Sequence, residues 1–234
     1  MKTALLIPTF NEIVGLRQIM PQIKDGWVDE IVFVDGNSTD GTIDYIKEHG
    51  YKLFLEKTPS ARRAMYEAVN YITSDVIITF SPDGNCIPEL IPKLIEKMKE
   101  GYDMVIVSRY AKGAKSEDDN IVTSFGNWLF TTTVNTLYDA KYTDVMGIYR
   151  AYKKELVSSL DLDKEITFTT PEKLFRTRLF WEPILSTRAA KRRLKIAEIA
   201  GDEPKRIGGE AKLQTIKWGA AYMYQVLREK VWWK

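Results

Sequence analysis

Asp83 and Asn85 are oxygen-bearing side chains, two residues apart, that directly follow a short apolar run at residues 76–80. The run is continuous and rich in β-branched residues, which is typical of a strand buried on both faces of a sheet. Ligands bind at the carboxyl edge of an open parallel sheet, so Asp83 and Asn85 could hold a divalent cation on the diphosphate of a nucleotide-sugar. The alternative is an Asx turn without a ligand, because Pro82 and Gly84 also favour turns.

Two earlier apolar runs end in polar turns of the same kind, at residues 8–12 and 35–38. Successive parallel strands point the same way, so both turns are expected on the same sheet edge as Asp83. Their acidic and amide side chains can hydrogen-bond a nucleobase and ribose hydroxyls. The sequence has no GxGxxG or GxxxxGKS/T motif, so the phosphates of a nucleotide would need a metal ion and basic side chains.

The composition excludes several classes of protein. The chain has 234 residues, 44% of them hydrophobic, which is enough for one domain with a sizeable core. Cys86 is the only cysteine and His49 the only histidine, which excludes an intrachain disulfide and a zinc-binding Cys/His cluster. The single histidine also argues against a Ser-His-Asp or Cys-His enzyme. The single cysteine favours a reducing compartment. No apolar run reaches membrane-spanning length, which predicts a cytoplasmic protein, soluble or peripheral at the cytoplasmic membrane face.

Charge is distributed unevenly along the chain, although its net value is only +2. Residues 173–234 hold 15 Lys and Arg against 6 Asp and Glu, a net charge of +9, whereas the remainder holds 19 against 26, a net charge of −7. A basic C-terminal third indicates either a polyanionic partner, such as substrate phosphates or an acidic lipid surface, or a solvated charged face. No nucleic-acid-binding motif appears, so nucleic acid is not expected as a partner.

Strands and helices are expected to alternate in the first half of the chain. Apolar runs predict strands at residues 3–7, 31–34, 52–55, 76–80 and 104–107, and helical periodicity predicts helices at 13–23, 43–49, 60–72 and 88–99. This alternation predicts right-handed βαβ crossovers, and therefore an α/β fold with a mostly parallel sheet covered by helices on both faces.

Beyond Tyr110 the regular alternation stops. A charged loop at 111–120, a candidate mobile lid, precedes a predicted helix at 121–137. The elements predicted after it are a return to the sheet at 144–150, a helix at 171–190, a strand at 195–200 and an amphipathic helix between Leu213 and Val231. No internal repeat or low-complexity linker is evident, so residues 1–234 are expected to form a single domain with an elaborated C-terminal half.

The motifs of the chain, taken in the order in which they occur, resemble those of family 2 glycosyltransferases, which have the Rossmann-like GT-A fold. The resemblance is carried by residues 7–12, 34–42, Asp83 and 108–110. Within the family, the chain looks most like polyprenyl-phosphate (dolichyl-phosphate) mannosyl- and glucosyltransferases, through the stretches 88–92, 101–103, 144–152 and 206–213. The resemblance implies a metal-dependent, inverting hexosyltransferase, with a nucleotide-sugar-binding half at 1–110 and an acceptor half at 111–234.

The resemblance also implies a role for each matched side chain. Asp83 and Asn85 would bind Mg²⁺ or Mn²⁺, and Asp144 would lie near the acceptor. The residues that would line the nucleotide pocket are Pro8, Phe10, Glu12 and Asp35. Those that would face phosphates of the donor or the acceptor are Arg109, Arg206 and Lys212. Two positions depart from the family pattern: Ser81 stands where the first DxD carboxylate is usual, and Gly36 replaces a second Asp.

The acceptor decides which further side chains the reaction needs. A polyprenyl phosphate, the favoured acceptor, is already anionic and needs no strong general base. Arg206, Lys212 and the basic cluster 191–195 would then hold it. A saccharide hydroxyl, the alternative acceptor, must lose a proton, and the candidates for that general base are Asp144 and Glu172.

Several of these residues also have a purely structural interpretation. Arg109 and Asp144 could form an ion pair, and residues 191–193 could be a solvated helix end. Ser81 and Gly36 keep open a protein of another class, a non-catalytic nucleotide-sugar-binding or scaffold protein.

Aromatic residues gather near the C-terminus among Lys and Arg, at Trp218, Tyr222, Trp232 and Trp233. Such a stripe could rest at a bilayer interface, as a peripheral membrane contact. It could equally pack on the core or on a second subunit, and the sequence does not predict an oligomeric state.

Overall fold

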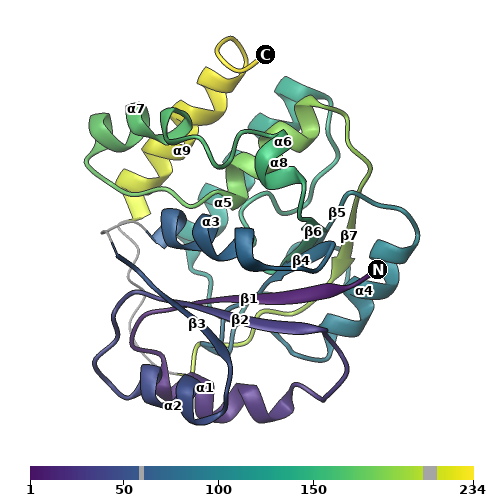
Figure 1. Cartoon of the computed structure of the whole chain (residues 1–234). Helices are drawn as coiled ribbons and strands as arrows, with labels where there is room; N and C mark the ends of the chain where they lie inside the picture. Colours follow the sequence, from purple (N-terminus) through teal and green to yellow (C-terminus); the bar gives the residue numbers. More distant parts are fainter. Residues whose placement is uncertain (58–60, 208–214) are drawn as a thin grey trace.

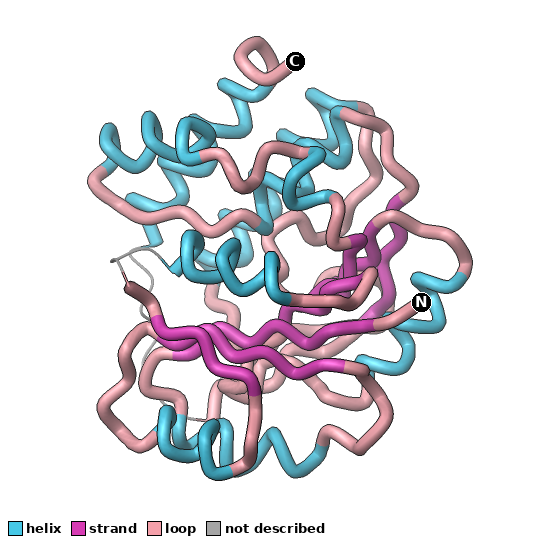
Figure 2. The backbone as a smooth tube through the Cα atoms, in the orientation of Figure 1, coloured by secondary structure: helices cyan, strands magenta, loops and turns pink. Residues whose placement is uncertain are grey.

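The computed structural model describes residues 1–57, 61–207 and 215–234 and shows one mixed sheet covered by helices (Figure 1). The strands are β1 (Thr3–Thr9), β2 (Glu30–Asp35), β3 (Lys52–Leu55), β4 (Val76–Thr79), β5 (Met104–Ser108), β6 (Arg150–Lys153) and β7 (Ile196–Ala200). They lie side by side in the order β3-β2-β1-β4-β6-β5-β7 (Figure 2). Only β6 is antiparallel to its neighbours, β4 and β5. The predicted α/β fold with a mostly parallel sheet is confirmed.

Helices connect the strands and extend the second half of the chain. The first half contains α1 (Ile13–Ile19) with the short 3-10 helix η1 (Met20–Gln22), α2 (Thr42–Glu48), α3 (Ala61–Tyr71) and α4 (Leu90–Lys99). The second half contains α5 (Ile121–Tyr138), α6 (Leu156–Ser159), α7 (Glu165–Phe175), α8 (Glu182–Lys191) and α9 (Thr215–Glu229). In Figure 1, α1 and α2 lie below the sheet, and α3, α7, α8 and α9 lie above it.

Each face of the sheet carries its own hydrophobic cluster. Along β1, Leu5 and Ile7 pack in the cluster that includes residues of α1, α2 and α4. Ala4 and Leu6 pack in the other cluster, with residues of α3, α5, α8 and α9. Successive residues of a strand point to opposite faces, so a strand covered on both sides must be apolar throughout. This is why the first strands could be recognised as continuous apolar runs.

The strand predicted at 144–150 is wrong in its position, because β6 begins only at Arg150. The residues before it form a turn that Asp144 holds together. Its Oδ1 accepts hydrogen bonds from the backbone N–H groups of Met146, at 3.2 Å, and Gly147, at 3.1 Å. A side chain that caps backbone groups in this way favours a turn over a strand.

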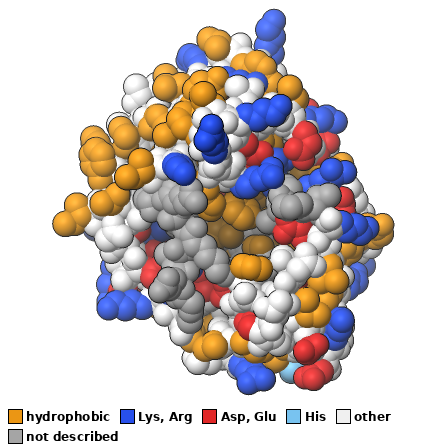
Figure 3. Space-filling view, turned by 90° about the vertical axis from the view of Figure 1, so that its left-hand side faces the viewer, with side chains coloured by type: hydrophobic (Ala, Val, Ile, Leu, Met, Phe, Trp, Pro, Cys, Tyr) orange, Lys and Arg blue, Asp and Glu red, His pale blue; other side chains and the backbone are white. Residues whose placement is uncertain are grey.

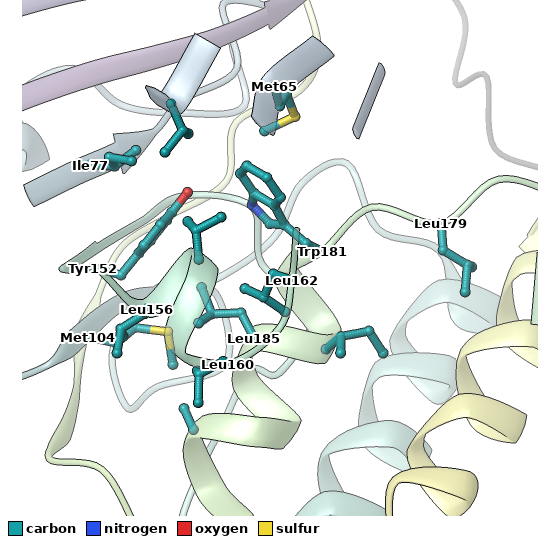
Figure 4. Close-up of a cluster of buried hydrophobic side chains, with 14 of the residues drawn as sticks. Met65, Ile77, Met104, Tyr152, Leu156, Leu160, Leu162, Leu179, Trp181 and Leu185 are labelled. Atoms are coloured by element: carbon teal, nitrogen blue, oxygen red, sulfur yellow. The ribbon is translucent and has the colours of Figure 1, made fainter. Parts of the chain in front are cut away.

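The helix predicted at 171–190 is also wrong, since the structure has two helices there, α7 and α8. Arg176, in the left-handed conformation with φ of 50°, ends α7. Leu179 and Trp181 in the connection are buried in the core cluster of Figure 4. Because Leu179 and Trp181 are apolar core residues, the apolar pattern of the sequence continues through this connection, although the connection is not helical. The short helix α6 was not predicted.

The C-terminal aromatic stripe packs partly on the protein itself. Trp233 is 5% exposed, and its indole Nε1 donates a hydrogen bond to Asp161 Oδ2 at 2.9 Å. Lys191 Nζ donates to backbone carbonyls of Glu229 and Trp233, and the Arg192 guanidinium lies 4.9 Å from the centre of a Trp233 ring. For Trp233 the core-packing alternative therefore holds, and the basic cluster that begins at residue 191 fastens the chain end.

In the parts of the chain that the structure describes, no helix combines the length and apolar character required to cross a bilayer.

Candidate active site

A cleft of about 730 Å³ opens at the carboxyl ends of the parallel strands. One wall comes from the turns after β1, β2, β4 and β5, and the other from α5, α9 and the segment leading into α8. Figure 3 looks onto a hollow with hydrophobic side chains inside it and acidic ones beside it. The predicted site residues that line the cleft are Pro8, Phe10, Glu12, Asp35, Asp83, Asn85, Arg109 and Arg206.

Asp35, the last residue of β2, joins the first two turns of the cleft. Its fully buried carboxylate accepts hydrogen bonds from Thr9 Oγ1, from Ser38 Oγ and from the Ser38 backbone N–H, each at 2.7 Å. These contacts fix the end of β1 against the turn after β2. Asp35 therefore shapes this wall of the cleft.

Gly36 leaves space that neighbouring side chains use. A Cβ atom at this position would lie 3.2 Å from Phe10 Cδ2 and 3.4 Å from Glu56 Oε2. Glu56 also lines the cleft, so a carboxylate stands beside the position where the family commonly has a second Asp. We did not predict Glu56, although it directly follows β3 and so falls on the same sheet edge.

The turn at Asp83 is closed by its own hydrogen bonds and by the segment around Arg206. Asp83 Oδ1 accepts from the Asn85 backbone N–H at 3.2 Å, which confirms the Asx turn, and Asp83 Oδ2 lies 3.3 Å from Arg206 Nη1. Asn85 Nδ2 donates to the Pro204 carbonyl at 3.0 Å. Asn85 Oδ1 is buried and has no hydrogen-bond partner among the described residues. Among the described residues, the turn therefore holds an amide oxygen without a partner two residues from a carboxylate.

Arg109 and Asp144 form a two-pronged ion pair beside the cleft. Arg109 Nε lies 2.7 Å from Asp144 Oδ2, and Nη2 lies 3.1 Å from Oδ1. Arg109 Nη1 also contacts Glu203 at 3.2 Å. Burial alone would raise the pKa of Asp144, but the charge and hydrogen bonds of Arg109 outweigh it and hold that pKa below its ordinary value. Asp144 is consequently a weak base, and its contacts orient Arg109.

The candidate lid at 111–120 contacts the segment that precedes Arg206. The Lys115 backbone N–H donates to Asp202 Oδ1 at 2.9 Å, and Ser116 Oγ donates to Glu203. Arg206 Nη2 lies 3.3 Å from Asp118 Oδ2. These two segments together close one side of the cleft, and the mobility of the loop stays a prediction.

Two predicted contributors, Glu172 and the basic cluster 191–195, do not line the cleft. Glu172 lies 3.4 Å from the buried Arg62 guanidinium and accepts a hydrogen bond from the Leu179 backbone N–H at 2.9 Å. It therefore ties α7 to α3 and is absent from the cleft lining. The cluster 191–195 lies at the C-terminal chain end, and Lys212 falls outside the described residues.

Sequence reasoning missed the second wall of the cleft. It is formed by aromatic side chains from three different elements together with one acidic residue, namely Phe130, Phe180, Glu182, Trp218 and Tyr222. Phe180 and Trp218 stack edge to face with ring centres 5.9 Å apart. Trp218 and Tyr222 are one helical turn apart in α9, but no spacing in the sequence links them to Phe130 or Glu182, which the fold brings to the same wall.

Comparison with known proteins identifies the family. Residues 4–161 match the model of "Glycosyl transferase family 2". The chain belongs to this family. This glycosyltransferase is 30% identical over 175 residues to a dolichol-phosphate mannosyltransferase of Pyrococcus furiosus, covering 70% of the chain and 49% of that relative. It is 26% identical over 252 residues to an undecaprenyl-phosphate mannosyltransferase of Micrococcus luteus, covering 99% of both. The chain thus spans about half the length of the first relative and nearly all of the second.

Solved structures show the same fold. The crystal structure of glucosyl-3-phosphoglycerate synthase from Mycobacterium tuberculosis in complex with Mn²⁺, uridine diphosphate and glucosyl-3-phosphoglycerate superimposes with a TM-score of 0.63. The superposition covers 98% of this chain and 79% of the synthase, at 17% sequence identity. At that identity the similarity establishes the GT-A type α/β fold of this glycosyltransferase and nothing finer.

The side chains at the β4 turn fit a hard divalent cation. Mg²⁺ and Mn²⁺ prefer oxygen ligands. Asp83 provides a carboxylate, and Asn85 Oδ1 is a buried acceptor that no described residue satisfies. Within the described ranges, no three Asp, Glu, Cys or His side chains form a metal-binding group. A cation at this turn would therefore take its remaining ligands from phosphates and water.

Proposed function

We propose that this glycosyltransferase moves a sugar from a nucleotide-diphospho-sugar to a polyprenyl phosphate, with Mg²⁺ or Mn²⁺ held by Asp83 and Asn85. The observation that carries the donor side is that Asp83 and Asn85 both line the cleft at the sheet edge where ligands bind, and that Asn85 Oδ1 has no partner in the described part of the chain. The acceptor class is supported by the names of the relatives, which include dolichol-phosphate and undecaprenyl-phosphate mannosyltransferases.

In this proposal the chain stabilises the charge that develops on the leaving nucleoside diphosphate. When bound, the cation would neutralise part of the diphosphate charge. Arg109 lines the cleft and is held by Asp144 and Glu203, and the guanidinium N–H groups not used in these contacts would donate to a phosphate oxygen. An acceptor phosphate oxygen forms the new bond to the anomeric carbon while the bond from that carbon to the diphosphate oxygen breaks.

Neither of the two predicted general bases is placed to take a proton from a saccharide hydroxyl in the cleft. A hydroxyl must lose its proton to a general base. Asp144 is engaged by Arg109, and Glu172 is paired with Arg62 outside the cleft. A phosphate acceptor is already ionised and needs neither of them.

A peripheral membrane contact is part of the proposal, and α5 rather than the C-terminus supports it. Ile121, Phe125 and Trp128 of α5 are 88%, 59% and 58% exposed. The opposite side of the same helix lines the cleft, and exposed hydrophobic side chains are seen beside the hollow in Figure 3. Helix α9 packs against α5 and exposes Ile216 and Lys217 near its start. An apolar face with an aromatic residue and a nearby cation suits a bilayer interface that presents the lipid acceptor.

Transfer from radiolabelled donors tests the proposal. The wild-type chain, a polyprenyl phosphate and Mn²⁺ are incubated with UDP-glucose, UDP-N-acetylglucosamine or GDP-mannose, and label is counted in the organic phase. We expect labelled lipid with one of the donors and about a hundredfold less with Asp83→Ala. Asp163→Asn, which changes a carboxylate outside the cleft, should behave as the wild type. A parallel reaction replaces the lipid with an oligosaccharide acceptor, and label that appears only in that reaction would overturn the lipid phosphate. An active Asp83→Ala would overturn the metal site.

A further inference from the structure

Glu182, the first residue of α8, is a buried carboxyl group in the cleft to which neither the sequence nor the proposed reaction gives a task. Its side chain is 3% exposed, and Oε1 has no hydrogen-bond partner among the residues that the structure describes. It lines the same cleft as Asp83. Leaving a buried carboxyl oxygen without a partner costs folding free energy, so an external donor that satisfies it would gain affinity.

The backbone at Glu182 is held rigidly. Arg150 Nη1 donates to the Glu182 carbonyl at 3.0 Å, and Arg150 Nε donates to the Gly147 carbonyl at 2.8 Å. Arg150 therefore fastens the start of α8 to the turn that positions Asp144. The flanking Trp181 and Leu185 are buried in the core cluster (Figure 4). A carboxyl group on such a fixed frame can recognise a ligand by geometry.

The surroundings of Glu182 decide which ligand group fits it. Phe180, Trp218 and Tyr222 share its wall of the cleft. An isoprenoid chain would leave the carboxyl oxygen unsatisfied, and a phosphate group would repel the ionised carboxyl. A sugar hydroxyl is neutral and donates a hydrogen bond, and the apolar face of a sugar ring packs on aromatic side chains.

We propose that the Glu182 carboxylate accepts a hydrogen bond from a hydroxyl group of the sugar that is transferred, and thereby helps determine which sugar this enzyme accepts. The inference rests on the proposed function, because it takes the donor to be a nucleotide-diphospho-sugar. With a lipid phosphate as acceptor, the donor is the sole source of sugar hydroxyls in the cleft.

Calorimetric titration separates the sugar from the rest of the donor. UDP and UDP-glucose, and GDP and GDP-mannose, are each titrated in the presence of Mn²⁺, and the affinity ratio within each pair measures the contribution of the sugar. For the pair that binds the wild type, we expect Glu182→Gln to reduce that ratio about tenfold, because a charge-assisted hydrogen bond becomes a neutral one. The affinity for the nucleoside diphosphate alone should be unchanged. Asp163→Asn is the matched control, since Asp163 Oδ1 is also buried without a partner but lies outside the cleft.

The pH dependence gives a readout that a structural role would not change. Burial raises the pKa of Glu182 to about 6 against the partial opposing effect of Arg150, and Tyr152 of β6 and Tyr222 of α9 are the other titratable groups near it. The sugar contribution in the wild type should therefore decrease below pH 6 and be independent of pH in Glu182→Gln.

The outcomes distinguish the inference from the function on which it rests. If the wild type binds none of the nucleotides, the proposed function itself fails. If the wild type binds and Glu182→Gln keeps the full sugar contribution, only the inference falls. If the variant binds normally but turns over a thousandfold more slowly on a hydroxyl acceptor, Glu182 acts as a base and the inference is likewise overturned.

Discussion

Single carboxylates in this glycosyltransferase differ mainly in what surrounds them. Asp144 and Glu182 are both buried, but Asp144 faces Arg109 at 2.7 Å, whereas Glu182 Oε1 has no partner among the described residues. The same desolvation thus ends in a lowered pKa for Asp144 and a raised pKa for Glu182. An ion-paired carboxylate orients its partner, and an unpaired one is available to a ligand.

Asp144→Asn should destabilise the protein by about 3 kcal/mol at pH 7, because it leaves Arg109 without its closest counter-charge. The pKa of Asp144 is below its ordinary value in the folded state, so its contribution to stability is present at neutral pH and is lost in strong acid. Urea unfolding at pH 7 measures the difference. A change below about 0.5 kcal/mol would show that Glu203 suffices to hold Arg109.

Glu182→Gln should stabilise the protein at pH 8 and leave it unchanged at pH 4. The pKa of Glu182 is about 6 in the folded state against an ordinary value of 4.5. The contribution of the protonated Glu182 to the free energy of unfolding is therefore complete below pH 4.5. About 2 kcal/mol of that free energy is lost as the pH rises through 6. Urea unfolding at the two pH values tests this. An equal gain at both would mean that repacking, rather than ionisation, is responsible.

Residues that follow apolar runs could be predicted as site residues, and residues that the fold gathers could not. Asp35, Asp83 and Arg109 each follow a recognisable strand, so the sheet edge brings them together as expected. Glu182 and Trp218 lie in helices whose approach to the cleft depends on tertiary packing. No spacing in the sequence marks them.

At the scale of elements, α5 has two functional sides. One side lines the cleft, and the other exposes Phe125 and Trp128. A helix that packed only on the core would carry polar side chains on its outer surface. The exposed apolar side of α5 therefore indicates that a partner covers it.

Phe125→Asp combined with Trp128→Asp should reduce cosedimentation with anionic vesicles at least tenfold. Both side chains are exposed, so the melting temperature should change little. Val14→Asp on α1, which changes an exposed apolar residue below the sheet, serves as the control. Unchanged vesicle binding of the double variant would exclude this side of α5 as the membrane contact.

Elements with strict local patterns were predicted, and those that depend on a side-chain cap were not. The strands and helices up to Ser108 follow the apolar periodicity. The turn at 144–149 exists because Asp144 caps backbone N–H groups, and α7 ends because Arg176 adopts a left-handed conformation. Neither the Asp144 cap nor the left-handed conformation of Arg176 produces a hydrophobic pattern from which it could be predicted.

At the scale of the molecule, metal and nucleotide should stabilise the fold together, since their proposed ligands come from segments far apart in the chain. Mn²⁺ with a bound nucleoside diphosphate at about a hundred times its dissociation constant should raise the melting temperature by about 5 °C or more. EDTA or Asp83→Ala should abolish the increase, and Asp163→Asn should keep it. Differential scanning fluorimetry measures it, and a shift that survives in Asp83→Ala would contradict the assigned metal ligands.

The reversed direction of β6 has a consequence for the edge of the sheet at which the cleft lies. Thr79 at the end of β4 pairs with Arg150 at the beginning of β6, so the connection entering β6 arrives on the same edge as the connections leaving the parallel strands. That entering connection carries Asp144, which holds Arg109, and its Tyr149 carbonyl accepts a hydrogen bond from the Val107 backbone N–H at 3.0 Å. An antiparallel strand thus lets a segment that enters the sheet, rather than one that leaves it, position a side chain of the cleft.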